Sequence, residues 1–193
     1  WVRYGQREIK KTQLRYHGGL TGGFTLSPLC IPRLLLKLVI GYGINMTRLS
    51  DPWNDYSELK GEVEELKQMG MTSVVNLIYS ISPRHTDEYY ARKARQAAAM
   101  KPYRLCFKDV AGMLTPDRAY TLAKLILENV GDVPVEFHSH CNNGLAPFNV
   151  LEVVKAGIRI VHTSIPPLAN GSAQPSIFNV VSNLRALGYK PLV

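Results

Sequence analysis

Two histidines, one residue apart, end an apolar segment of the chain. In VEFHSH, residues 135–140, His138 and His140 alternate with Phe137 and Ser139. Because successive residues of a β-strand point to opposite faces, both imidazoles would lie on one face at the carboxyl end of the strand. Taken singly, each would be interpreted as an ordinary histidine near a loop. As a pair they can bind one divalent cation, and the ions that imidazole and oxygen ligands suit include zinc and manganese.

A lysine occupies the equivalent place in the preceding apolar segment. RLCFKD, residues 104–109, sets Lys108 near a strand end, where an unpaired ammonium group would be costly to bury. One interpretation is that Lys108 pairs with an acid elsewhere in the chain. The other is chemical, because burial lowers the pKa of a lysine and a neutral amine can combine with carbon dioxide. The resulting carbamate offers oxygen to a metal, and the residues alone leave both interpretations open.

The elements that must position these groups alternate along the chain. We expect strands near 14–18, 46–50, 72–79, 104–109, 135–140 and 158–165, and helices near 28–42, 57–69, 86–99, 116–129, 146–156 and 176–187. This alternation favours an α/β fold with a parallel sheet. Long polar loops after the strands and short ones after the helices are typical of a (β/α)8 TIM barrel, although about six βα units are found where a closed barrel needs eight. A doubly wound open sheet is the competing architecture.

Composition limits the class of protein. The 193 residues are 46% hydrophobic and 20% charged, which predicts one domain over residues 1–193. The net charge of +8 is scattered along the chain, so we expect a solvated surface and no nucleic-acid partner. A non-catalytic basic barrel that binds nucleic acid or a protein is the alternative from another class.

Hydropathy and cysteine content bear on location. No apolar run reaches the ~20 residues of a membrane span, and LCIPRLLLKLVIGYGI is interpreted as a core-facing helix. No secretory signal opens the sequence. The three cysteines, Cys30, Cys106 and Cys141, lack metal-site spacing, which indicates a reducing compartment and predicts a cytoplasmic location.

A family resemblance rests on several motifs in order. FKDVAGMLTP, HSHCNNG and TSIPPLANGSAQPS resemble the Lys-Asp-Met-Ala, His-x-His and Gly-Thr-Ser-Gln-Pro-Ser segments of biotin-dependent carboxyltransferases. These are the carboxyltransferase domain of pyruvate carboxylases, the transcarboxylase subunit of the same type and the alpha subunit of oxaloacetate decarboxylase, within the HMG-CoA lyase-like TIM-barrel metalloenzymes. Upstream, RLSDPWND and ISPRHTDEYY are similar to the family's Arg-x-Phe-Asp and Ile-Ser-Pro-x-His-Thr segments.

The resemblance implies an activity and roles for particular residues. The activity is transfer of a carboxyl group between carboxybiotin and pyruvate or oxaloacetate through a metal-stabilised enolate. Lys108, carbamylated, and His138 and His140 would be metal ligands. Ser172 would be the counterpart of a family Thr that shuttles a proton between biotin and the substrate methyl group, although a Ser in such a loop can also be a cap or turn residue. The implied partners are a biotin carrier domain or protein, a small 2-oxo acid and a second copy of the chain in a homo-oligomer.

The departures from the family pattern set further expectations. The family's first strand carries an Arg-Asp pair whose Asp is a metal ligand; here WVRYGQRE resembles the region after the second strand. Two strands and one ligand are therefore expected to be missing from this chain, which we interpret as part of a longer polypeptide. Arg15 or His17 would replace a substrate-binding Arg, Phe24 stands where a Tyr contacts biotin, and His162 replaces an Asp.

A related activity is the alternative. The 4-hydroxy-2-oxoacid aldolases and acyl-CoA lyases or synthases of the same superfamily use a similar His-x-His strand, and HCNNGLA is similar to the aldolase version. In those enzymes the residue before the Asp of the neighbouring strand is usually small. Lys108 therefore favours carboxyl transfer.

Overall fold

The computed structural model describes residues 2–20 and 27–193, and its six strands form one parallel sheet. The strands are β1 (Tyr16–His17), β2 (Met46–Leu49), β3 (Thr72–Ile78), β4 (Arg104–Asp109), β5 (Val135–Ser139) and β6 (Ile160–Val161). Each strand pairs with its neighbour in chain order, without the reversal that a doubly wound sheet requires. The order confirms the predicted barrel winding and excludes the competing architecture.

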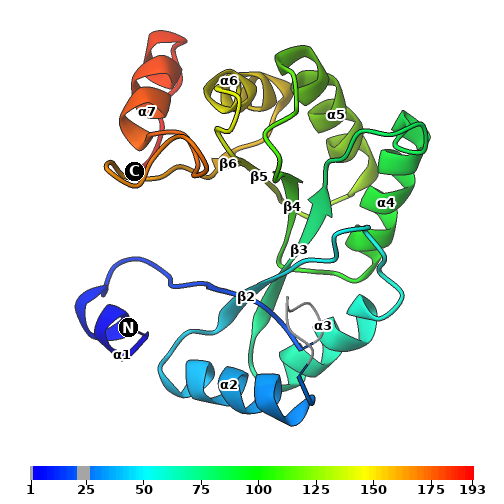
Figure 1. Ribbon diagram of the computed structural model, residues 1–193, viewed down its shortest axis with the longest axis vertical. Coiled ribbons are helices and arrows are strands. Elements are labelled where there is room, and N and C mark those ends of the chain that lie inside the picture. Colours follow the sequence, from blue (N-terminus) through cyan, green and yellow to red (C-terminus); the bar gives the residue numbers. More distant parts are fainter. Residues whose placement is uncertain (1, 21–26) are drawn as a thin grey trace.

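The helices lie outside the strands, and together they form an arc that is open between α1 and α7 (Figure 1). They are α1 (Val2–Glu8), α2 (Cys30–Gly41), α3 (Leu59–Gln68), α4 (Asp87–Ala99), α5 (Pro116–Asn129), α6 (Ala146–Ala156) and α7 (Ile177–Ala186). Every predicted strand and helix is present, and α1 was not predicted. The arc is an incomplete (β/α)8 barrel, as expected.

Strand alternation separates an apolar outer face from a polar inner face. Phe107 of β4 and Phe137 of β5 are register partners, both fully buried, with ring centroids 5.4 Å apart. They belong to the main hydrophobic cluster, which includes residues of the outer helices. The flanking residues Lys108 and His138 therefore face the inside of the arc. Packing of the outer face thus decides where the chemical groups lie.

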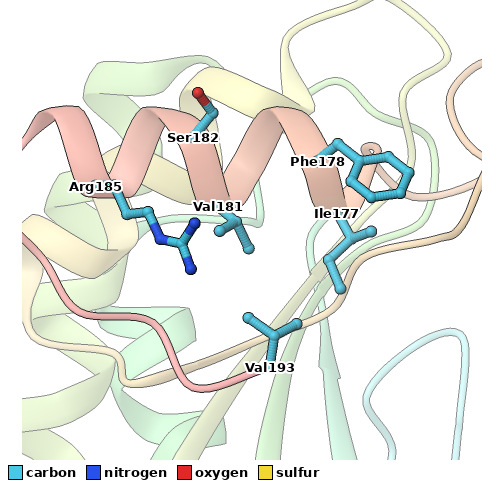
Figure 2. A pocket seen from close by; sticks show the side chains of 6 residues that line it. All are labelled: Ile177, Phe178, Val181, Ser182, Arg185 and Val193. Carbon is cyan, nitrogen blue, oxygen red and sulfur yellow. The ribbon is translucent and has the colours of Figure 1, made fainter.

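Helices α2 and α7, towards the two ends of the arc, expose apolar side chains. In α2, predicted to face the core, only Leu36 and Val39 are buried, whereas Ile31, Leu34 and Leu38 are about half exposed. Near α7, apolar side chains and Arg185 line a cavity of about 360 Å³ (Figure 2). This cavity holds none of the predicted site residues. In the described part of the chain, no helix has the length and apolar character needed to cross a membrane.

The buried aromatic pair gives a stability prediction. Phe107→Ala should lower the free energy of unfolding by about 3–5 kcal/mol, because it removes a buried ring and leaves a cavity under the strands that carry the site. The matched control is Phe178→Ala on α7, where the residue is 67% exposed and the expected change is below about 0.5 kcal/mol. Urea unfolding measures both. Equal losses would contradict the assignment of Phe107 to the core.

Candidate active site

The two imidazoles of the His-x-His segment converge. The Nε2 atoms of His138 and His140 are 3.1 Å apart, a separation that two nitrogen ligands of one cation would have. The Nδ1 of His140 lies 2.5 Å from the carbonyl oxygen of Ser172. A carbonyl only accepts, so Nδ1 of His140 carries the proton and its Nε2 has a free lone pair. This contact prepares His140 to bind a metal through Nε2.

Lys108 lies beside this pair. It is the register partner of His138 and is 8% exposed. Burial lowers the pKa of the Lys108 ammonium group, and the nearby Arg48 guanidinium lowers it further. Within residues 2–20 and 27–193 no acid pairs with it, so the interpretation of Lys108 as half of an ion pair finds no support. A buried, unpaired amine next to two imidazoles fits a carbamate ligand.

The loop after β4 is held closely against β5. Asp109 accepts hydrogen bonds from the backbone N–H groups of Met113 and Leu114 and from the Ser139 hydroxyl, each at 3.1 Å. Gly112 has a φ of +70°, and a Cβ there would lie 2.7 Å from the carbonyl oxygen of His140. Position 112 of the AGML turn therefore needs glycine, because its backbone packs directly against the backbone of His140.

Arg48 of β2 is a site residue that sequence reasoning missed. Its guanidinium contacts the Nδ1 atoms of His138 at 3.2 Å and His17 at 3.3 Å. No ion pair in the described part of the chain involves Arg48, and its buried Nε has no hydrogen-bond partner there. Arg48 is thus a cation that points into the site without an anion. The segment RLSDPWND, already matched to the family's Arg-x-Phe-Asp, contained the signal.

Gln174 is the second residue that received no predicted role. Its Nε2 is 3.3 Å from Nε2 of His138 and 3.5 Å from Nε2 of His140. It lies in the loop after β6, two residues beyond Ser172, within the matched GSAQPS segment. The same loop therefore brings the backbone carbonyl of Ser172 and the amide of Gln174 to the paired imidazoles.

Arg15 and His17, both expected to contact substrate, differ in their surroundings. Arg15 donates to Glu136 at 2.7 Å, so its charge is already compensated. Burial lowers the pKa of His17 to about 4, assisted by the positive charges of Arg48, Lys108 and Arg15. Phe24, expected near biotin, lies outside the described residues.

Glu136 is the buried acid of the interior. Burial by itself would raise its pKa, but His162 and Arg15 outweigh that effect and hold the pKa at about 2. Arg104 lies 3.6 Å from the same carboxylate. Cys106, Glu136 and His162 could in principle enclose a cation, since their ligand atoms lie within 4.8 Å of one another. However, burial raises the pKa of Cys106 to about 12, and such a cation would compete with Arg15 for Glu136.

A cavity of about 470 Å³ contacts His138, Arg15 and Arg48, whereas Lys108, His140 and Ser172 are not among its lining residues. It opens at the carboxyl ends of the strands, where a parallel barrel assembles its active site. It is lined by Arg15, Tyr16, His17, Arg48, His138, Val161, His162, Thr163 and Gln174. Its volume is within the range of small-molecule sites.

The winding of the strands is that of a TIM barrel, and two facing imidazoles lie at the carboxyl end of one strand. The chain belongs to the HMGL-like family, which matches residues 54–193. It is 35% identical over 147 residues to a pyruvate carboxylase subunit of Methanocaldococcus jannaschii, covering 76% of this chain and 26% of that protein. It is 34% identical over 156 residues to the 2-oxoglutarate carboxylase large subunit of Hydrogenobacter thermophilus, covering 79% and 24%.

A solved structure supports the fold. The carboxyl transferase domain of Rhizobium etli pyruvate carboxylase with pyruvate superposes with a TM-score of 0.87 at 22% identity, covering 98% of this chain and 34% of that chain. The chain thus spans about a quarter of the length of the curated relatives described above. The predicted resemblance is confirmed at the level of family and fold.

The charge cluster around Glu136 predicts a pH-dependent stability. Glu136→Gln should lower the free energy of unfolding by roughly 3 kcal/mol at pH 7, because the carboxyl pKa is about 2 in the folded chain against 4.5 ordinarily. The contribution is fully present above pH 4.5 and is lost as the pH falls towards 2. The difference between wild type and variant should therefore narrow below pH 4.5.

Urea unfolding at a series of pH values measures this difference. Glu64→Gln, at an exposed position of α3, is the control and should stay within about 0.5 kcal/mol of wild type at each pH. A gap between Glu136→Gln and wild type that is independent of pH down to 3 would contradict the role of the ionised carboxylate.

Proposed function

We propose that the full-length protein is a biotin-dependent carboxyltransferase that moves a carboxyl group between carboxybiotin and a small 2-oxo acid such as pyruvate or oxaloacetate. The observation that carries the proposal is Lys108, a buried amine that no acid of the described residues pairs with, in register with His138 beside His140. The names of the relatives agree with carboxyl transfer. They differ in the acid named, pyruvate or 2-oxoglutarate, so the acceptor is left as a class.

The donor set fits a divalent cation. Lys108 as a carbamate would give oxygen, and His138 and His140 would give the two Nε2 atoms that already lie 3.1 Å apart. Zinc and manganese both accept such ligands. When bound, the cation supplies Lewis-acid stabilisation of the enolate of the 2-oxo acid. His140 is held ready by its bond to the Ser172 carbonyl.

Arg48 would bind the carboxylate of the substrate. A guanidinium that lacks an anion and lines the cavity offers charge-assisted hydrogen bonds to a planar carboxylate. Binding there would orient the 2-oxo acid with its keto group towards the paired imidazoles. Arg15 is less suited to this role, because Glu136 already holds it. His17, in contact with Arg48, would help to shape the same end of the cavity.

The hydroxyl of Ser172 would take or return the proton of the substrate methyl group at its Oγ. The contact of its backbone carbonyl with Nδ1 of His140 supports this proposal, because it holds the residue beside a proposed metal ligand. Phe24 would contact biotin. A biotin carrier domain or protein, a homo-oligomeric assembly and a cytoplasmic location complete the proposal.

Replacement of the lysine tests the central observation. Lys108→Ala in the full-length protein should lose bound metal and reduce biotin-dependent exchange between labelled pyruvate and oxaloacetate more than about 100-fold, since even the loss of an outer partner of a metal ligand costs 10–100-fold. Native intact mass should show one added carbon dioxide on the wild type and none on the variant. The control Lys124→Ala, on the exposed side of α5, should behave as wild type.

The activity of Lys108→Ala also distinguishes carboxyl transfer from the alternative activity of the same superfamily. Exchange that persists in Lys108→Ala would contradict the carbamate. Cleavage of a carbon–carbon bond without biotin, indifferent to this substitution, would instead identify an aldolase or acyl-CoA lyase.

A second experiment examines Arg48. Arg48→Gln should raise the KM for the 2-oxo acid by about 10–100-fold, because hydrogen bonds to a charged group contribute about 1.5–3 kcal/mol. Arg48→Lys keeps the charge but not the planar fork, so its KM should lie between those of Gln and wild type. The KM for biotin, measured in the same assays, serves as the internal control. An unchanged KM for the 2-oxo acid in both variants would remove Arg48 from the substrate site.

A further inference from the structure

His162 connects a proposed metal ligand to the buried acid. It follows β6, where the carboxyltransferase pattern has an Asp, and its side chain is 16% exposed. Its Nδ1 lies 2.9 Å from Nδ1 of His138. Its Nε2 lies 3.2 Å from Oε1 of Glu136 and 3.1 Å from Nη2 of Arg15. Nδ1 of His162 thus meets an imidazole and, at 3.4 Å, Nη1 of Arg48, whereas Nε2 meets both an acceptor and a donor.

These contacts allow one arrangement of protons that leaves no place for a metal on His138. If Nδ1 of His162 donates to Nδ1 of His138, the remaining proton of His138 is on Nε2 and points to Nε2 of His140. Nε2 of His162 then accepts from Arg15. Nδ1 of His138 also accepts from Arg48 in this arrangement, whereas Nε2 of His162 and Oε1 of Glu136 face each other as two acceptors. Nε2 of His138 is a donor and cannot bind a cation.

A second arrangement is the one that a metal needs. In it, Arg48 and Arg15, whose guanidinium groups only donate, give up their contacts with Nδ1 of His138 and Nε2 of His162. Nδ1 of His138 now donates to Nδ1 of His162, and Nε2 of His162 donates to Glu136. Nε2 of His138 is then free, as is Nε2 of His140. Both rings remain neutral in either arrangement. One proton leaves Nε2 of His138, one passes along the 2.9 Å contact, and one arrives at Nε2 of His162, so the proton count is unchanged.

We propose that His162 and Glu136 form an outer relay that sets the tautomer of His138 and thereby the affinity of the site for a divalent cation. This inference rests on His138 and His140 as the metal ligands of the proposed function. His162 and Glu136 are positioning residues, because they act on the cation through His138. Carboxylate–histidine–metal relays orient ligands in this way in other proteins. Here a second imidazole extends the relay between the carboxylate and the ligand.

A second cation held by Cys106, Glu136 and His162 is the competing explanation of the same cluster. Nε2 of His162 and Oε1 of Glu136 are both within hydrogen-bond distance of Arg15, which would compete with such a cation, although Oε2 of Glu136 has no hydrogen-bond partner among the described residues. The relay uses the same atoms with hydrogen bonds that are already formed. The two explanations differ in metal stoichiometry and in the importance of Cys106.

The test is metal affinity, measured on the full-length protein after removal of metal with a chelator. Titration with Co²⁺, followed by its visible absorption, and competition with Zn²⁺ give the affinities. His162→Leu should bind both ions about 10–100-fold more weakly than wild type, because His138 loses its acceptor. His162→Asn, whose amide oxygen can accept from Nδ1 of His138, should recover affinity to within a few-fold of wild type. A merely structural role of His162 would not produce this rescue.

Three further variants complete the design. His85→Leu, in the loop before α4, and Cys106→Ser should bind Co²⁺ as wild type does. Glu136→Gln, studied at a temperature where it is folded, should bind Co²⁺ several-fold more weakly than wild type. This variant tests the contact between Glu136 and His162 even if His162→Leu fails to fold. Each variant's melting temperature is measured without metal.

Several outcomes would overturn the relay. The first is a metal affinity of His162→Leu equal to that of wild type or, if that variant does not fold, the same result for Glu136→Gln. The second is a metal affinity of His162→Asn that is no higher than that of His162→Leu. The third is a second equivalent of bound metal that is present in wild type and absent in Cys106→Ser. A wild-type protein that binds neither ion would refute the proposed metal centre itself, and the relay with it. Normal metal binding with wild-type affinity in the His162 variants refutes the relay alone.

Discussion

The parallel pairing of β4 with β5 in a single register is the constraint on which the rest of the molecule depends. It sets Lys108 opposite His138 and Cys106 opposite Glu136 on the inner face, and Phe107 opposite Phe137 on the outer face. A shift of one residue in either strand would exchange these faces, burying charges among the helices and exposing aromatic rings to the cavity. The register of these two strands therefore fixes both the packing of the outer face and the positions of the reactive groups on the inner face.

The inner face also has a marked imbalance of charge. Arg15, Arg48, Arg104 and Lys108 face a single described carboxylate, that of Glu136. Arg15 and Arg104 lie close to that acid, and no carboxylate in residues 2–20 and 27–193 forms an ion pair with Arg48 or Lys108. A cavity with this surplus favours anionic molecules through its field, in agreement with the proposed 2-oxo acid substrate. Burial and these cations also lower the pKa of His17, His138 and His162, which favours their neutral forms.

Much of this arrangement could be predicted from local sequence, and the remainder depends on contacts between distant segments. Strand and helix positions follow from apolar periodicity and turn residues, and the facing pair His138 and His140 follows from strand alternation. Helix α1 escaped prediction because none of its residues is buried, so it has no core-facing pattern. Arg48 and Gln174 lay inside recognised motifs, but their contacts with His138 join residues 90 and 36 positions apart. The pairing of Arg15 with Glu136 joins residues 121 positions apart, and no local pattern could indicate it.

The bond between His140 and the loop after β6 has a consequence for how this site can vary. The loop holds the imidazole through a main-chain oxygen, which every amino acid possesses, and not through the side chain at position 172. Orientation of the ring and the chemical character of that side chain are thereby uncoupled. A different side chain at position 172 would therefore change the chemistry offered there while the imidazole keeps its orientation.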